Sequence, residues 1–230
     1  MNDLFLNSAT MGIVLSFLAY AVGILIKTKM KKAVFNPLLI SIVIVIAVVL
    51  IFNVDYDSYN QSAKYISYLL TPATVSLAIP LYRQLDLLKE NFMAITIGIL
   101  SGVLTSLISV LGMSVLFGLT HEEYVTLLPK SITTAIGMGV SEELAGYVTI
   151  TVVVIIITGI LGNMIGSFAC KLFRIKNPIS KGLALGTSSH AIGTTKAMEM
   201  GEIEGAMSSL SIVVAGLLTV VLASVFAMLY

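Results

Sequence analysis

Long uncharged stretches alternate with short charged ones along most of the chain. Six stretches of at least 18 residues contain no Asp, Glu, Lys or Arg. Roughly 20 predominantly apolar residues allow a helix to cross the hydrocarbon core of a bilayer, so each stretch predicts one membrane-spanning helix. The six stretches are 4–26, 33–54, 65–82, 91–120, 144–170 and 205–230.

Two further apolar segments differ from ordinary membrane spans. Residues 182–195 form an uncharged window of only 14 residues. Segment 124–143 is apolar in part, but Lys130 lies near its start and Glu142 and Glu143 lie at its end. Both segments are candidates for broken or re-entrant helices, which are tolerated at membrane depth where they are buried in protein or line a cavity.

The composition agrees with a membrane protein and excludes other classes. Hydrophobic residues make up 57% of the 230 residues and charged residues only 11%, with a mean hydropathy of +1.02. A soluble domain of this size could not bury so much apolar surface. The net charge of +1 gives no electrostatic footprint for nucleic acid. We therefore predict an all-α, polytopic helical bundle in a lipid bilayer, with one integral membrane domain over residues 1–230.

The reactive side chains favour neither a metal centre nor an enzyme. The chain has one cysteine, Cys170, so an internal disulfide cannot form. The two histidines lie far from it in sequence and match no metal-ligand spacing. A Ser-His-Asp triad cannot be built within one short helix. We expect no catalytic residue, no metal and no cofactor.

Basic residues set the predicted orientation. Ten of the 13 Lys and Arg residues fall in loops 27–32, 83–90 and 171–181, which the positive-inside rule places in the cytoplasm. The N-terminus then lies outside, and the first stretch is interpreted as a retained helix because it lacks a basic n-region. With 124–143 re-entering from outside and 182–198 crossing, the chain would make seven crossings and end inside.

Two short segments resemble each other about half a chain apart. Residues 76–83 and 189–196 align at an offset of 113, and Thr74 matches Thr187 just before them. If both segments cross the membrane, they do so in opposite directions, as in the inverted repeats of secondary transporters. Chance similarity among residues common in membrane helices is the alternative. The predicted three-helix units are 33–120 and 144–230, with 124–143 between them and a third copy of the motif at 133–137.

Three polar segments contain the candidate binding residues, and the first is 71–76. Pro72 and the later Pro80 each remove a backbone donor, which predicts two helix breaks. Thr74 and Ser76 lie between these breaks and are candidate substrate ligands. A simple kink packed on a neighbouring helix is the alternative.

The second polar segment, 129–143, carries an isolated cation. Pro129 suits the first turn of a helix, whose free amides, together with the charge of Lys130, would favour an anion. Gly137 marks a helix break or a close helix contact. An interfacial turn with Lys130 reaching the lipid headgroups is the alternative. The predicted ligands are Lys130, Ser131, Thr133 and Thr134.

The third polar segment, 186–196, contains five hydroxyl side chains and a histidine. Gly186 and Gly193 are predicted helix breaks. His190 can change its charge near physiological pH, which would couple transport to protons. A neutral histidine bonded to a carbonyl, with hydroxyls that merely join helices, is the alternative. The predicted substrate ligands are Thr187, Ser188, Ser189, His190 and Thr194.

Taken together, the motifs resemble the LrgB/CidB family from about residue 30 to the end of the chain. The resemblance is carried by Asn36-Pro37-Leu38-Leu39, Pro72-Ala73-Thr74, Ala78-Ile79-Pro80-Leu81-Tyr82, Leu128-Pro129-Lys130-Ser131, Gly186-Thr187-Ser188-Ser189-His190 and Gly205-Ala206-Met207-Ser208-Ser209.

The resemblance implies two kinds of function. Bacterial members are described as antiholin-like or holin-like proteins of the cell membrane, which modulate murein hydrolase activity and autolysis with a small LrgA/CidA-like partner. Plastid members exchange glycolate and glycerate, and some bacterial pairs are described as pyruvate transporters. We expect a carrier of small monocarboxylates that acts with such a partner, and a homo-oligomer is compatible with it. The alternative is an antiholin-like regulator without a transported substrate.

Overall fold

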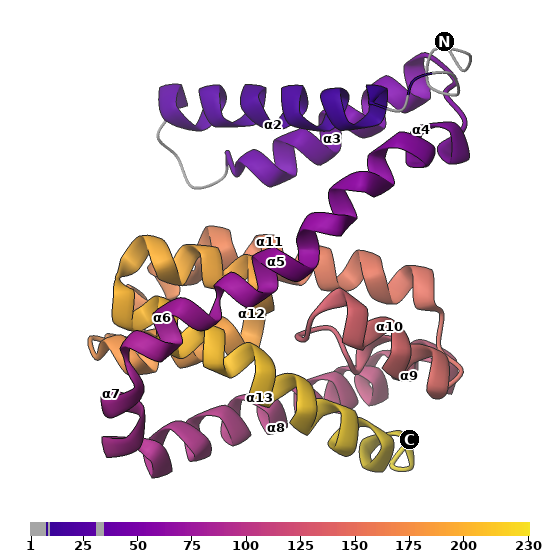
Figure 1. The fold of residues 1–230 in the computed structure, drawn as a ribbon. Coiled ribbons are helices and arrows are strands. Elements are labelled where there is room, and N and C mark those ends of the chain that lie inside the picture. Colours follow the sequence, from indigo (N-terminus) through magenta and orange to yellow (C-terminus); the bar gives the residue numbers. More distant parts are fainter. Residues whose placement is uncertain (1–7, 9, 31–34) are drawn as a thin grey trace. The chain divides into compact units, whose positions relative to one another are not determined.

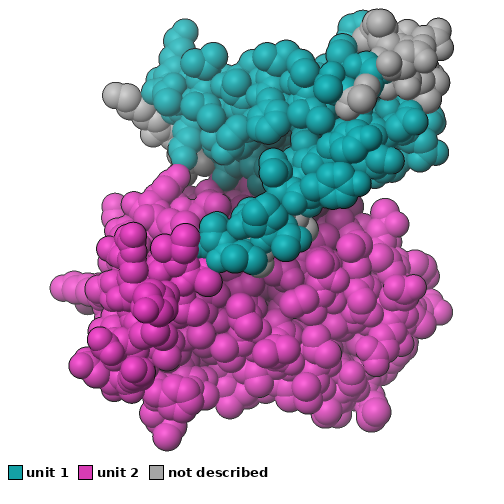
Figure 2. Space-filling view, viewed as in Figure 1, with its two compact units in different colours: residues 1–76 teal, residues 77–230 magenta. Residues whose placement is uncertain are grey.

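The chain is mostly helical in the part that the structure describes. This computed structural model describes residues 8, 10–30 and 35–230, and these ranges contain no strand (Figure 1). The predicted all-α class is therefore confirmed. The chain divides into two compact units, Met1–Ser76 and Leu77–Tyr230 (Figure 2).

In the first unit, helix α2 (Met11–Met30) packs against the two helices that follow it in the chain. The backbone amide of Gly12 donates to Ser62 Oγ at 2.8 Å, and the hydroxyls of Ser16 and Tyr59 lie 2.8 Å apart. Gly23 lies against the backbone of Pro37, so these helices approach closely where side chains are small. The elements are α2 (Met11–Met30), α3 (Pro37–Ile51), α4 (Tyr56–Ala63), the 3-10 helix η1 (Lys64–Leu69) and α5 (Leu70–Ser76).

The stretch predicted as one span at 65–82 is a series of short helices. Pro72 is the third residue of α5, and Pro80 is the third residue of α6 (Ala78–Arg83). A proline in the first turn of a helix removes an N–H that has no partner within the helix. A new helix therefore begins two residues before each proline.

The second unit contains three long helices separated by two segments that turn back. The long helices are α8, α11 and α13, and α8 precedes the first returning segment. The elements after α6 are α7 (Leu85–Glu90), α8 (Phe92–Phe117), α9 (His121–Leu127), α10 (Thr134–Glu143), α11 (Val148–Leu172), α12 (Pro178–Met200) and α13 (Glu202–Ala227).

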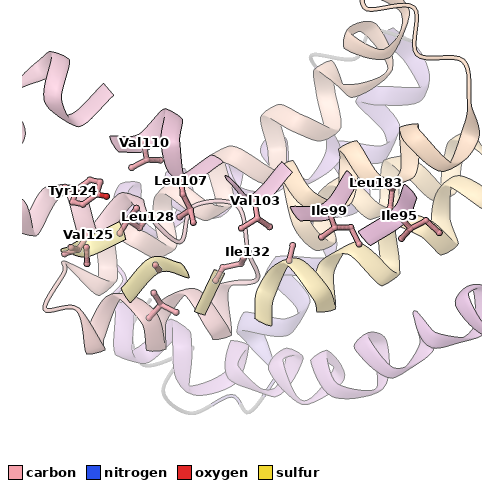
Figure 3. Packing of buried hydrophobic residues seen from close by; sticks show 14 of the residues in the cluster. Ile95, Ile99, Val103, Leu107, Val110, Tyr124, Val125, Leu128, Ile132 and Leu183 are labelled. Carbon is pink, nitrogen blue, oxygen red and sulfur yellow. The ribbon is translucent and has the colours of Figure 1, made fainter. Parts of the chain in front are cut away.

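The apolar core of the second unit follows one face of α8. Buried residues recur along this helix at intervals of three or four, which places them on one side. They pack with residues of α9, of the turn after it, of α12 and of α13 (Figure 3). The α8 residues are Ile95, Ile99, Val103, Leu107 and Val110.

The first returning segment is a helical hairpin formed by α9 and α10, which we call hairpin 1 (residues 121–143). Thr126 in its first arm accepts from the backbone amide of Tyr147 and, through its carbonyl, from Thr151 Oγ1. Ser141 in its second arm accepts from the same Thr151 hydroxyl at 2.7 Å. Both arms therefore lie beside the start of α11, and the re-entry predicted for 124–143 stays a prediction.

The second returning segment is α12, which bends sharply at His190; we call it hairpin 2 (residues 178–200). His190 has φ 43° and ψ −138°, whereas the other non-glycine residues with positive φ follow the ends of helices. Both arms contact the same end of α13. Gly182 in the first arm lies against Glu204, and Met198 in the second arm lies against Gly205.

Hairpin 2 overturns part of the predicted topology. Segment 182–198 does not cross, because Met200 lines the same pocket as Lys171 and Lys181. At the other end of the unit, His121 Nδ1 donates to the carbonyl of Tyr230 at 2.7 Å. The predicted seven crossings put His121 outside and the C-terminus inside, so that part of the prediction is wrong. Without a crossing at 182–198, α13 runs in the direction opposite to the predicted one.

The two halves of the second unit share a pattern at an offset that differs from the predicted one. Phe92 and Val148 begin α8 and α11, and they lie 56 residues apart. At the same spacing, residues 134–137 (Thr-Ala-Ile-Gly) match 190–193 (His-Ala-Ile-Gly). Each half is thus a long helix followed by a returning hairpin.

The two halves run in opposite directions. Going along hairpin 2 toward its bend, the residue numbers of its contacts on α8 increase, from Gly98 to Gly102. The residue numbers of its contacts on α11 decrease, from Gly166 to Gly159. Helices α8 and α11 are therefore antiparallel, and the hairpins enter from opposite ends of the unit. The predicted three-helix units at offset 113 are not supported, because segment 76–83 is split between the two compact units.

The long helices of both units have the length and composition of membrane spans. Among the described residues, five helical stretches are long and apolar enough to cross a bilayer. α3 is apolar but shorter, with 15 residues. The five stretches are Met11–Met30, Tyr56–Arg83, Phe92–Phe117, Val148–Leu172 and Glu202–Ala227.

The hairpin geometry predicts which positions share a side of the membrane. Cysteines introduced singly at Lys176 and Gly201, in a Cys170→Ala background, should react with an impermeant thiol reagent from the same side. A cysteine at Glu122 should react from the opposite side, together with one at Tyr230. Labelling of positions 176 and 201 from opposite sides would show that α12 spans the membrane.

The close contact of hairpin 2 with α13 predicts a difference between two glycines. A Cβ at Gly186 would lie 2.5 Å from the Ser208 carbonyl oxygen, whereas a Cβ at Gly112 meets no atom within 4 Å. We expect Gly186→Ala to lower stability by about 1–3 kcal/mol through overpacking. Gly112→Ala should raise it by about 1 kcal/mol through helix propensity. Thermal denaturation in detergent measures both, and equal shifts would contradict the tight contact.

Candidate functional site

Hairpin 1, hairpin 2 and α8 line an open cavity of about 380 Å³ that contains several hydroxyl groups. Its lining includes hydroxyls and a single charged side chain, that of Lys130. A cavity with few, convergent polar groups is the usual form of a small-ligand site. The lining residues are Ser101, Gly102, Thr105, Ser106 and Ser109 of α8, Lys130 and Ser131 of hairpin 1, and Ala184, Thr187 and Ser188 of hairpin 2.

Lys130 is held at the tip of hairpin 1 by two hydroxyls. Its Nζ donates to Ser106 Oγ at 3.2 Å and to Ser131 Oγ at 3.0 Å, and the two hydroxyl oxygens are 3.0 Å apart. The lining contains no carboxylate, and no described carboxylate forms an ion pair with Lys130. The half-buried ammonium therefore has neutral partners only, and an anion in the cavity would supply the missing charge.

The remaining wall of the cavity comes from α8, whose hydroxyls were not among the predicted ligands. Ser101, Thr105 and Ser109 are spaced at intervals of four, so they lie on one face of the helix, and Ser106 lies beside them. Each of the three donates to a carbonyl of its own helix. The regular spacing of hydroxyls within an otherwise apolar stretch was a usable signal for this polar face.

Hairpin 2 contributes the predicted residues Thr187 and Ser188. Thr187 is buried and donates to the carbonyl of Leu183 at 2.7 Å, while its side chain lies against Gly102 of α8. Ser188 is exposed in the cavity and donates to the carbonyl of Ala184 at 2.7 Å. These two predicted ligands therefore lie in the same cavity as Lys130 and Ser131.

The other predicted ligands of hairpin 2 point away from the cavity. The ring of His190 lies against Gly159, and its Nε2 donates to the carbonyl of Ile155 at 3.0 Å. His190 has an exposed fraction of 3% and, contrary to the prediction, does not line the cavity. Ser189 packs on Gly162, and Thr194 pairs with Ser208 of α13 at 2.7 Å. These three side chains join helices instead of facing a ligand.

The second helix of hairpin 1 begins later in the sequence than predicted. Pro129 follows α9 in a turn, and the next helix begins at Thr134 with Thr133 as its N-cap. The predicted helix start at Pro129, with Ser131 to Thr134 in the first turn, is therefore wrong. Thr133 and Thr134 are half-buried and do not line the cavity.

Three predicted glycine breaks lie inside helical arms. Gly137 is within α10 and packs on Ile155, whereas Gly186 and Gly193 lie on either side of the bend in α12. The bend itself is at His190. At these positions the absence of a side chain permits close packing instead of a helix break.

Thr74 and Ser76 belong to the first unit. Thr74 is in α5, and its side chain is outside the part that the structure describes. Ser76 ends α5, is exposed, and donates to the carbonyl of Ala73 at 2.6 Å. Their predicted pairing with His190 stays a prediction.

The cavity contains groups that suit a small anion. Within the described ranges, no group of three His, Cys, Asp or Glu residues is placed to hold a metal ion. The fixed ammonium of Lys130 and the surrounding hydroxyls can bind a carboxylate by charge-assisted and neutral hydrogen bonds. Ser188 of hairpin 2 and Ser106 of α8 both line this cavity.

Comparison with known proteins identifies the family. Residues 16–229 match the LrgB-like family. The chain is 39% identical over 216 residues to "Antiholin-like protein LrgB" of Bacillus cereus (strain B4264) and of Bacillus anthracis (strain A0248), which covers 94% of each chain. No solved structure matches the chain. The protein is a polytopic membrane protein, and it belongs to the LrgB-like family.

Proposed function

We propose that this protein is a carrier or facilitator of small monocarboxylates of the pyruvate and glycolate type. The observation that carries the proposal is the geometry of Lys130, whose ammonium contacts Ser106 and Ser131 and no described carboxylate. A carboxylate bound in the cavity would pair with this charge and accept from the neighbouring hydroxyls. A cavity of about 380 Å³ has room for a small carboxylate with some of its water.

The two opposed hairpins support transport rather than simple binding. Secondary transporters commonly place their substrate between inverted repeats, beside interrupted helices near the middle of the membrane. Here both hairpins reach Ile155, about two turns from the start of α11: Gly137 packs on its side chain and His190 binds its carbonyl. Movement of either hairpin would open the cavity toward the end from which that hairpin enters.

A second function is favoured by the relatives rather than by the geometry. The similar Bacillus proteins are named antiholin-like, which supports a regulator of murein hydrolase activity and autolysis. Such a regulator needs no substrate, and Lys130 would then serve only to join hairpin 1 to α8. In the carrier proposal, altered lysis follows from altered carboxylate exchange.

The carrier is proposed to act in the cell membrane with a small LrgA/CidA-like membrane protein. The basis is the family resemblance, together with the extensive exposed apolar surface that α2, α8 and α11 present. Co-purification of the full chain with this partner tests the assembly. Uptake with and without the partner then shows whether the chain transports alone.

The carrier proposal predicts the effect of removing one charge. Lys130→Gln should lower carboxylate affinity roughly 10- to 100-fold, because a hydrogen bond to a charged group contributes about 1.5–3 kcal/mol. Uptake of labelled pyruvate and glycolate into proteoliposomes measures the change. Lys196→Gln is the matched control, since Lys196 pairs with Glu199 at 2.8 Å and does not line the cavity.

The same variant separates the two functions. If Lys130→Gln abolishes uptake and shifts autolysis only when external carboxylate is present, lysis depends on transport. If correctly inserted wild-type protein shows no carboxylate uptake with or without its partner, while it still changes autolysis, the carrier proposal is wrong.

A further inference from the structure

A second cavity, separate from the one that contains Lys130, lies at the C-terminal end of α11. Its volume is about 550 Å³. Part of its wall comes from the last turns of α11 and the loop that follows, and part from both ends of hairpin 2. The lining residues are Ser167, Cys170, Lys171, Arg174, Ile175, Lys176, Lys181 and Met200.

Three of the four basic residues around this cavity have no counter-ion in the described part of the chain. Lys181 pairs with Glu204 at 3.4 Å. Lys171, Arg174 and Lys176 make no side-chain hydrogen bond or ion pair with any residue that the structure describes. By contrast, Lys89 and Arg83, basic residues in another loop, are each near a carboxylate. Other described basic side chains, such as Lys130, are also unpaired, but three unpaired ones line this single cavity.

Arg174 occupies a backbone position that favours glycine. Its φ is 55°, its amide donates to the Lys171 carbonyl, and the amide of Ile175 donates to the carbonyl of Cys170. This is a Schellman helix end, in which glycine usually takes the left-handed position. Gly118 has that role at the equivalent end of α8. An arginine at this position has a backbone cost that glycine would avoid.

We propose that this cavity binds a phosphate group, at the depth where the headgroups of anionic lipids lie. Helix α11 has the length and hydropathy of a membrane span, so its end lies near a membrane surface. Basic pockets between membrane helices at the cytoplasmic side are typical lipid-headgroup sites. The planar guanidinium of Arg174 can donate two parallel hydrogen bonds to a phosphate, and Lys171 and Lys176 add charge.

Apolar surface beside the cavity suits a lipid better than a soluble phosphate. Ile175 and Met200 line the cavity itself. Leu172 and Phe173 are next to Arg174 in the chain and have exposed fractions of 62% and 72%. Acyl chains could pack on these residues while the headgroup binds the three cations. Because hairpin 2 contributes Lys181 and Met200, a bound phosphate would also restrain its two ends.

Thermal denaturation of the purified full chain in detergent tests the site with three additives: phosphatidylglycerol, phosphatidylcholine and inorganic phosphate. We expect phosphatidylglycerol to raise the melting temperature and phosphatidylcholine to leave it unchanged. Stabilisation by phosphatidylglycerol alone identifies a lipid headgroup as the source of the phosphate. Stabilisation by inorganic phosphate as well identifies a site for free phosphate. Stabilisation by neither overturns the proposal.

Two variants assign the effect to these residues. Arg174→Gly keeps the left-handed backbone, so the protein should fold at least as well as wild type while its affinity for phosphatidylglycerol falls roughly fivefold. Lys176→Gln should cause a similar loss. Lys89→Gln is the matched control, because Lys89 is basic but lies outside the cavity. Wild-type affinity in both cavity variants, or an equal loss in the control, would overturn the proposal.

Discussion

A helix that turns back inside a membrane leaves backbone groups without partners, and these groups must be satisfied by protein. The second unit of this protein depends on how that constraint is met at the bend of hairpin 2. The carbonyl of His190 accepts from Thr194 Oγ1 at 2.9 Å, and the carbonyl of Ile192 accepts from Asn163 Nδ2 at 2.9 Å. The imidazole of His190 fixes the bend to α11 through the carbonyl of Ile155. Polar side chains around the bend therefore donate hydrogen bonds to backbone carbonyls.

Close packing makes these hydrogen bonds possible. Gly182 and Gly186 allow the first arm of hairpin 2 to lie against α13, and Gly159 and Gly162 allow α11 to approach the bend. Without a hydrophobic driving force between helices in lipid, such small-residue contacts provide much of the association energy. The arrangement leaves the outer face of the same arm, with Thr187 and Ser188, for the polar cavity. The position of the candidate site is thus a consequence of how the bend is supported.

Much of the fold could be predicted from the sequence, because spans depend on apolar length. Helix α8 lies within its uncharged stretch, α11 and α13 overlap theirs apart from two or three residues at one end, and 124–143 forms a helical hairpin. Hairpin 2 could not be recognised by the same rule. A straight helix and two short arms of equal total length have the same hydropathy, and the bend is at a histidine rather than at a glycine or proline. The direction of α13 and the side of the C-terminus depend on that one segment.

The candidate site was predictable where charge or spacing distinguished a residue. Lys130 was recognisable as an isolated cation in an apolar segment, and Ser131, Thr187 and Ser188 share its cavity. Composition could not separate Thr187 from Ser189 or Thr194, because neighbours on one helix differ only in the direction of their side chains. The α8 hydroxyls could not be assigned to the site from the sequence, because only the fold brings residues 101–109 to the tip of hairpin 1.

Protection of a thiol in the cavity tests most directly whether the two hairpins form a carboxylate site. In a Cys170→Ala, Ser188→Cys variant, the rate of labelling by a small water-soluble thiol reagent is measured with and without pyruvate. We expect pyruvate to slow labelling, and adding Lys130→Gln to remove that protection, because Lys130 and Ser188 line the same cavity from different hairpins. Labelling rates that do not respond to pyruvate, or protection that persists without Lys130, would contradict a carboxylate site between the hairpins.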